Sequence, residues 1–301
     1  MHNQPIAFQA PAAEAAAFIL PNPGELFSAR ADRLAVLAMN HSLGDWLLFL
    51  AGLSRAQDAA LQALPSLALP AAATLEQARQ HAMPLIDPMQ RPGLWRETLR
   101  QIVRQVGADA PPAARETLTS LLNASDEVLD SLADTLLTGT PSADQNARLP
   151  FVAAALQVVY SKFASQLDAA QLQALDVHGV CPCCGSLPVA SVVRLGATIN
   201  NLRYLHCALC NTEWNVTRAT CTACDTDKGV ALLEIEGSTG AVRAETCDSC
   251  KNYLKIVYQE KDPHVDPVAD DLATLALDML VDQAGYSRAG PNLLLIGAYS
   301  D

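Results

Sequence analysis

Eight cysteines in the second half of the chain have the types and spacing of metal ligands. They form four C-x2-C pairs, and each half of the segment reads C-x2-C-x22-C-x2-C. Adding 40 to every cysteine position of the first half gives the second half, so the segment is an internal repeat. The repeat predicts two separate metal sites of four thiolates each. The first comprises Cys181, Cys184, Cys207 and Cys210, and the second comprises Cys221, Cys224, Cys247 and Cys250.

This spacing suits a tetrahedral site. Two residues between cysteines allow a tight turn, here called a knuckle, that points both sulfurs at one ion, and a hairpin delivers the second knuckle. The residue after a knuckle often needs a positive φ, and three of the four residues there, Gly185, Asn211, Asp225 and Lys251, tolerate that region. A ribbon of about 30 residues has too little core to fold alone, so we expect metal binding to supply much of its folding free energy.

Thiol redox chemistry is the main alternative for these residues. Cys181-Pro182-Cys183-Cys184 resembles a glutaredoxin-type active site, which would follow a strand at the N-terminus of a helix. Catalysis by one pair does not account for four pairs in matching positions, so we favour metal binding. Cys183, the ninth cysteine, is either a spectator on the knuckle or a thiol tuned by the metal site. Spacing alone does not separate zinc from a mononuclear iron.

No catalytic motif accompanies the cysteines. The chain lacks H-E-x-x-H, G-x-S-x-G, a P-loop and G-x-G-x-x-G. His206 precedes Cys207 and could support the metal site, but a partly exposed strand histidine is the simpler interpretation. We therefore predict no catalytic residues, no organic cofactor and no enzyme activity.

The elements that must position the cysteines begin with an all-α domain over residues 1–177. Amphipathic helices are expected with a break near His41–Gly44, and a long helix is expected from about Phe151 to Leu175. Another helix is expected at Asp126–Leu137, with Ser125 as its N-cap and Gly139 after its end. Its predicted buried stripe is Val128, Leu129, Leu132 and Leu136.

After this domain the pattern changes to short β-prone runs around the cysteines, Val189–Leu195, Val230–Ile235 and Tyr253–Tyr258. We predict two tandem rubredoxin-like or zinc-ribbon-like modules over residues 178–219 and 220–262. Residues 263–301 then form a C-terminal helix and a short extended tail at Asn292–Ile296, packed back on the other domains. Asp266 should cap this helix, and its expected apolar stripe, ending at Gly285, is Leu272, Leu275, Ala276, Met279 and Leu280. The fold class is multi-domain, α with small β modules.

Charge and hydropathy exclude several functions. The formal net charge is −12, while residues 181–261 carry eight basic and eight acidic groups. Eight thiolates would make this segment negative even with two bound ions, which disfavours nucleic-acid binding. The chain has no apolar run long enough for membrane insertion, and Met1–Pro23 lacks the features of a signal peptide. We therefore expect a cytoplasmic protein, where cysteines serve as metal ligands or redox thiols rather than structural disulfides.

The chain resembles the formate dehydrogenase accessory protein FdhE family from about Pro21 to Ile296. The most specific segments are Val180-Cys181-Pro182-Cys183-Cys184-Gly185-Ser186-Leu187-Pro188 and Arg203-Tyr204-Leu205-His206-Cys207-Ala208-Leu209-Cys210. The N-terminal part adds Arg30-Ala31-Asp32-Arg33-Leu34, His41-Ser42-Leu43-Gly44-Asp45-Trp46-Leu47 and Gln57.

This resemblance implies a cytoplasmic, non-enzymatic accessory factor that binds the catalytic subunit of a respiratory formate dehydrogenase. It also implies rubredoxin-like ribbons associated with iron, so iron is favoured over zinc for the two mononuclear ions. No motif in the helical domain identifies the residues that contact the client, and a homodimer is left open. The alternatives are a rubredoxin-type electron-transfer protein or thiol oxidoreductase, and a nucleic-acid-binding ribbon protein, which the acidic charge disfavours.

Overall fold

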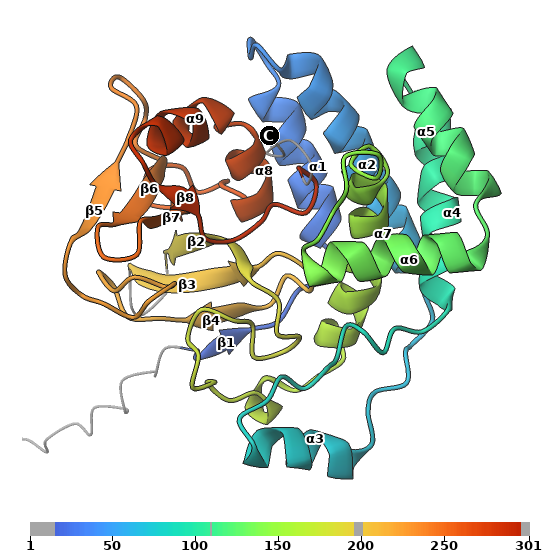
Figure 1. Ribbon diagram of the computed structural model, residues 1–301, viewed down its shortest axis with the longest axis horizontal. Helices are drawn as coiled ribbons and strands as arrows, with labels where there is room; N and C mark the ends of the chain where they lie inside the picture. The colour runs from blue at the N-terminus through green and yellow to red at the C-terminus, as the bar shows by residue number, and fades with distance from the viewer. Residues whose placement is uncertain (1–15, 109, 196–200, 296–301) are drawn as a thin grey trace, which may run out of the picture.

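The computed structural model describes residues 16–108, 110–195 and 201–295, and it places a helical region beside a mixed sheet (Figure 1). The central helix is α7 (Leu149–Ser165), whose sequence is apolar on nearly every side. It packs against α2 (Gly44–Ala63), α4 (Leu94–Gly107) and α6 (Asp126–Thr138). A helix without a polar face must be surrounded, and this burial makes α7 the centre of the helical region. The remaining helices there are α1 (Leu26–Leu37), α3 (Ala72–Gln80) and α5 (Pro112–Asn123).

Several predicted helix ends are confirmed. The chain breaks between α1 and α2 at residues 38–43, and a Cβ on Gly44 would lie 2.7 Å from the Ala38 carbonyl oxygen. The Ser125 side chain caps α6 by accepting from the Val128 N–H, and Gly139 follows with φ +70°. Two predicted details were wrong. Val128, predicted to be buried, is 44% exposed, because α6 faces α7 through Leu129, Leu132 and Leu136. The long helix ends at Ser165 rather than Leu175, and only a short 3-10 turn follows at Ala169–Gln171.

The two cysteine ribbons share one continuous sheet. Its strand order is β1-β4-β3-β2-β7-β6-β5, with β8 beside β7. The first ribbon supplies β2 to β4 and the second β5 to β7, and parallel pairing of β2 with β7 joins them, with Ser191 opposite Ile256. All three predicted β-prone runs form strands. The strands are β1 (Phe18–Ile19), β2 (Pro188–Arg194), β3 (Leu202–Cys207), β4 (Glu213–Asn215), β5 (Val230–Leu233), β6 (Val242–Cys247), β7 (Asn252–Tyr258) and β8 (Ser287–Arg288).

The C-terminal segment packs back on the other elements, as predicted. Asp266 caps α8 (Pro267–Leu272) by accepting from two backbone N–H groups, and α8 lies between α1 and the strands β2 and β7. The single long helix was wrong, because the chain breaks at Ala273–Thr274 before α9 (Leu275–Gln283). The predicted apolar stripe was also wrong beyond Leu272.

Helix α9 instead buries Leu277, Asp278 and Val281, and leaves Met279 and Leu280 exposed. Its buried face is set by an ion pair between Asp278 and Lys255, which an apolar stripe cannot indicate. In the tail, residues 292–295 form no strand, and Ile296 lies outside the described residues.

The main hydrophobic core runs without interruption from the helices into the first ribbon. It includes α7, parts of the other helices, α8 and the cysteines of the first ribbon. One smaller cluster joins the two ribbons through Val192, Tyr204 and Val257, and another packs β6 and β7 against α9. Within the described ranges, none of the helices combines the length and apolarity needed to cross a bilayer.

Candidate metal centres

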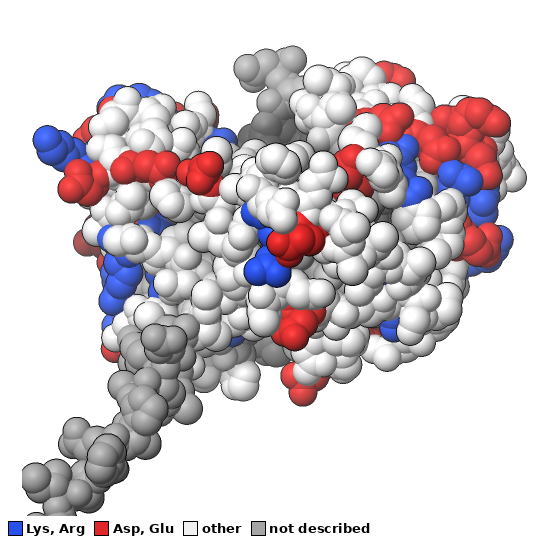
Figure 2. Space-filling model, turned by 90° about the horizontal axis from the view of Figure 1, so that it is seen from below, with Lys and Arg blue, Asp and Glu red and all other residues white. Residues whose placement is uncertain are grey.

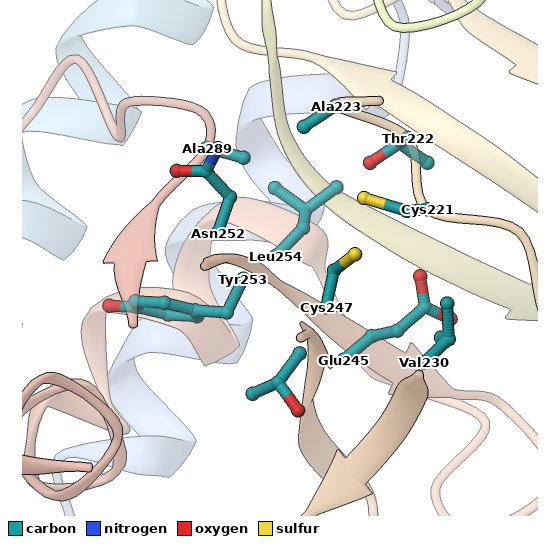
Figure 3. Close-up of a pocket in the computed structure, with 11 residues that line it drawn as sticks. Cys221, Thr222, Ala223, Val230, Glu245, Cys247, Asn252, Tyr253, Leu254 and Ala289 are labelled. Carbon is teal, nitrogen blue, oxygen red and sulfur yellow. The ribbon is translucent and has the colours of Figure 1, made fainter. Parts of the chain in front are cut away.

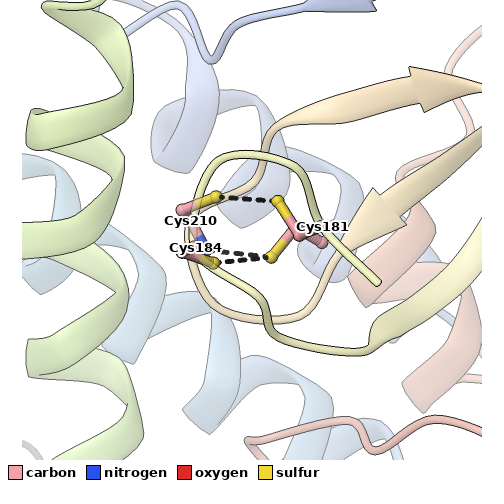
Figure 4. Close-up of side chains that lie close together, drawn as sticks. Cys181, Cys184 and Cys210 are labelled. Carbon is pink, nitrogen blue, oxygen red and sulfur yellow. Dashed lines mark hydrogen bonds between the residues drawn. The ribbon is translucent and has the colours of Figure 1, made fainter. Parts of the chain in front are cut away.

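The eight cysteines meet in two groups of four, as the 40-residue repeat predicts. Within each group one ligand atom per residue lies within 4.8 Å of the other three, and the described residues form no further cluster of this kind. In the first group, Cys181 Sγ lies 3.6 Å from Cys210 Sγ (Figure 4). Cys184 Sγ lies 3.5 Å from Cys207 Sγ. In the second group, the corresponding sulfur distances are both 3.7 Å.

These distances fit an ion bound by four sulfurs. Metal–sulfur bonds of about 2.3 Å in a tetrahedron place the sulfurs about 3.8 Å apart, close to the observed spacing. A disulfide would need about 2.05 Å. All nine cysteines are free thiols. The eight clustered residues therefore have the geometry of two four-cysteine sites, which zinc and mononuclear iron satisfy equally. That these residues bind metal ions stays a prediction.

The backbone of each knuckle has the conformation that its sequence predicts. The residues after the knuckles, Gly185, Asn211, Asp225 and Lys251, all have positive φ, between 55° and 74°. At three of these positions the backbone N–H bonds back to the carbonyl of the first cysteine of the knuckle, for example Gly185 to Cys181 at 2.8 Å. In the second knuckle, the N–H groups of Leu209 and Cys210 point at Cys207 Sγ, both at 3.4 Å. Such donors stabilise a thiolate.

The protonation preferences of the thiols differ with their surroundings. Burial raises the pKa of Cys181 and of Cys207 well above the ordinary value. Burial also acts on Cys247, but backbone N–H groups of Cys250 and Ser249 and neighbouring thiols lower its pKa to about 7. Cys221 shows the reverse balance, because burial raises its pKa to about 12. An ion must therefore displace protons at most of these positions, which makes binding depend on pH.

The helical region holds the first site directly. The backbone N–H groups of Leu85 and Ile86 donate to the carbonyls of Pro182 (3.3 Å) and Cys183 (2.9 Å), like a short strand pairing with the first knuckle. On the other side, Gln157 of α7 donates through Nε2 to the Ala208 carbonyl at 2.8 Å. Both knuckles of the first site thus bind to segments from the helical region.

A polar network fastens the residue that follows the second knuckle. Asn211 donates to Ser161 of α7 at 2.8 Å and accepts from Arg30 of α1 at 2.9 Å. Arg30 also pairs with Asp266, the cap of α8, at 3.1 Å. One buried asparagine therefore links the first site to α1 and α7, and through Arg30 to α8. The sequence pattern did not indicate this network, although Arg30 lies in a motif that supports the family resemblance.

His206 is not the partly exposed strand histidine that the sequence favoured. It is 4% exposed, and its ring nitrogens face Glu213 Oε1 at 2.9 Å and Asn211 Oδ1 at 3.0 Å. Burial opposes the charge of Glu213, but the bonds to His206 and Arg194 outweigh it and lower its pKa to about 2. The prediction failed because Asn211, the partner of His206, is itself held by Ser161 of α7 and Arg30 of α1, which are distant in sequence. His206 thus supports the turn that carries Cys207 and Cys210.

The two copies of the repeat differ at the paired arginines. Arg203 is 1% exposed and donates to Glu245 Oε1 at 2.6 Å and to the Thr220 carbonyl at 3.2 Å. Its repeat counterpart, Arg243, pairs with Glu234 near the surface. Arg203 therefore ties β3 of the first ribbon to both segments that lead into the second site, at Cys221 and Cys247.

The knuckle from Cys181 to Cys184 does not have the structural surroundings of a thiol-oxidoreductase active site. The knuckle from Cys181 to Cys184 lies in a turn that leads into β2, not at the N-terminus of a helix. Cys183 is fully buried in the main core, where solvent and substrates do not reach it. The spectator role for Cys183 is therefore the one that the structure supports.

Comparison with known proteins supports one family over nearly the whole chain. Residues 15–176 match the description FdhE, N-terminal, residues 180–218 match FdhE, central domain, and residues 219–295 match FdhE, C-terminal domain. A curated relative from Haemophilus influenzae, "Protein FdhE homolog", is 38% identical, covering 95% of this chain and 93% of the relative. "Protein FdhE" from Salmonella paratyphi B is 35% identical, covering 92% and 90%.

A solved structure agrees with these matches. The crystal structure of the FdhE protein from Pseudomonas aeruginosa superposes with a TM-score of 0.80 and 37% identity. The superposition covers 93% of this chain and 99% of the crystallised one. The similarity thus extends to the arrangement of the helical region, both ribbons and the C-terminal helices.

Proposed function

Because the chain belongs to the FdhE family, we propose that it is an accessory factor that binds the catalytic subunit of a respiratory formate dehydrogenase and supports its maturation. The observation that carries this proposal is the match along nearly the full length, with both four-cysteine clusters in place. In this role the protein binds a client and does not turn over formate. Cytoplasmic action follows from the same proposal.

The two clusters would each hold one mononuclear ion, with iron favoured over zinc through the family resemblance. Bound metal would cross-link two knuckles that have little core of their own, and iron would add one-electron chemistry. The chain's own residues hold the sulfurs in place: knuckle N–H groups donate to them, and Arg203 and Asn211 fix the segments around them.

Nucleic acid is not the proposed partner. The formal net charge is −12. On the face shown in Figure 2, charged side chains stand in small clusters of both signs, with a wide uncharged area between them. A nucleic-acid site needs a continuous basic surface. The uncharged area is instead compatible with contact to another protein.

Electron transfer of the rubredoxin type is the second candidate, and one observation favours it. Cys224 of the second cluster is exposed, so an ion there would lie close to the surface. Reversible one-electron reduction of the iron-loaded protein, together with electron exchange with a defined redox partner, would support this candidate. Without such a partner, the exposed site would serve another purpose.

The proposed function is tested by measuring the binding of the anaerobically purified dehydrogenase catalytic subunit to the immobilised full-length protein. We expect saturable binding by the wild type and no formate oxidation by the protein alone. Replacing all eight cluster cysteines by serine should weaken binding, because both ribbons lose their fixed surface. Absence of binding by the metal-loaded wild type, or tight salt-sensitive retention on DNA instead, would refute the proposal.

A further inference from the structure

The two metal sites differ sharply in their access to solvent. In the first, the residues Cys181, Cys184, Cys207 and Cys210 are at most 2% exposed. In the second, Cys221 and Cys247 are buried, but Cys224 is exposed and Cys250 is half-buried. The repeat is thus symmetric in sequence and asymmetric in burial.

The asymmetry has a structural cause. The first site lies under the helical region, with Leu85, Ile86 and Gln157 bonded to its knuckles. The second ribbon lies at the far end of the sheet from those helices, where β5 is the outermost strand (Figure 1). Its contacts on the other side, through α9 and β8, hold β6 and β7 but leave Ala223 and Cys224 of the first knuckle exposed.

Open space adjoins the second site. A cleft of about 340 Å³ is lined by Cys221 and Thr222 of its first knuckle, by Asp225 after it, and by His178, whose Nδ1 lies 3.2 Å from Asp225 Oδ1. On the inner side, Cys221 and Cys247 face each other beside β5 and β7, close to Val230 and Leu254 (Figure 3). A small molecule can therefore approach this knuckle from solvent without moving any helix.

We infer that the two sites divide their tasks: the first is a sealed structural cross-link, and the second is an exchange site. The second site takes up and releases soft metal ions, and external thiols or chelators reach it through Cys224 and Cys250. Thiol reactivity and metal exchange both require access to the sulfur. Access to the first site requires local unfolding of the first ribbon away from α7. Metal exchange at the first site is therefore slower than at the second.

The repeat supplies matched variants for a test with the full chain loaded with two Zn²⁺ ions. A chromogenic zinc chelator in excess should remove one ion quickly and the other at least about 100-fold more slowly, as expected when release needs an unfavourable opening step. Cys224→Ser should abolish the fast phase and keep the slow one. Its counterpart, Cys184→Ser, should abolish the slow phase and keep the fast one. Gln157→Ala, which removes the bond to the Ala208 carbonyl, should accelerate only the slow phase.

A second measurement on the wild type does not depend on whether a variant folds. Alkylation with N-ethylmaleimide during chelation, mapped by mass spectrometry, should label Cys224 and Cys250 first and Cys181 and Cys184 last. Loss of both ions at one rate, a single bound ion, or labelling of both clusters at equal rates would overturn the inference. Neither measurement involves a dehydrogenase, so its outcome is distinct from that of the client-binding experiment.

Discussion

Replacing Cys207 by serine should destabilise the helical region as well as the first ribbon. Cys207 belongs to the sealed cluster, and its loss removes one of four predicted ligands from a unit whose folding we expect to depend on metal binding. The sequence alone suggests that the helical region, with a core of its own, would stay folded. The continuous core argues otherwise, because helices and first-site cysteines belong to one hydrophobic cluster.

The magnitude follows from the bonds that would be lost. Four hydrogen bonds join the first ribbon's knuckles and Asn211 to the segment at Leu85–Ile86 and to α7. At about 1 kcal/mol each, they contribute about 4 kcal/mol, before any apolar contact is counted. For a region of this size, 1 kcal/mol corresponds to about 2–4 °C, so the helix transition should fall by about 8–16 °C.

The matched control is Cys247→Ser, at the equivalent position of the second repeat. The second ribbon has no bonds of this kind to α7 among those described, so the helix transition should fall by less than about 4 °C. Thermal unfolding of the zinc-loaded proteins, followed by the helical circular dichroism signal, measures both shifts. Equal shifts for the two variants, or an unchanged helix transition in Cys207→Ser, would refute the view that the first site supports the helices.

Two further predictions concern buried charges. The pKa of Glu213 is lowered to about 2 from an ordinary 4.5, so it contributes stability that is present above pH 4.5 and is lost as pH falls towards 2. Glu213→Gln should therefore reduce stability by up to about 3 kcal/mol at neutral pH, and its difference from the wild type should shrink on acidification in urea titrations. Lys255 is fully buried against Asp271 and Asp278, so Lys255→Met should cost about 3–5 kcal/mol by leaving these carboxylates undercompensated. The solvent-exposed pair of Lys251 with Asp248 makes Lys251→Met the control, with a much smaller loss in the same titrations; equal losses would contradict the argument.

Local features of this fold were predictable from the sequence because their causes are local. The grouping of the cysteines follows from the repeat, and the positive φ values after the knuckles follow from the chemistry of Gly185, Asn211 and Asp225. The caps at Ser125 and Asp266 follow from side chains that compete for the first backbone N–H groups of a helix. Each of these depends on a few neighbouring residues.

The remaining features depend on pairs that are distant in sequence. Parallel pairing of β2 with β7 joins Ser191 to Ile256, and nothing near either residue indicates the other. The same limit explains the errors at His206 and α9. His206 bonds to Asn211, which α7 and α1 hold from far away in the chain, and the buried face of α9 is set by the ion pair of Asp278 with Lys255. Apolar periodicity does not detect a buried charge whose partner lies on another element.

The difference between the two repeats shows how one folding unit can serve two purposes in the same chain. Both copies keep the knuckle geometry, so both can bind an ion. The first copy adds residues that face the helices: Asn211 accepts from Arg30 and donates to α7, whereas its counterpart Lys251 pairs with Asp248 at the surface. Arg203 points inward to the second ribbon, whereas Arg243 lies outside. These differences place the first cluster among the helices, sheet and C-terminal segment, and leave the second where other molecules can reach it.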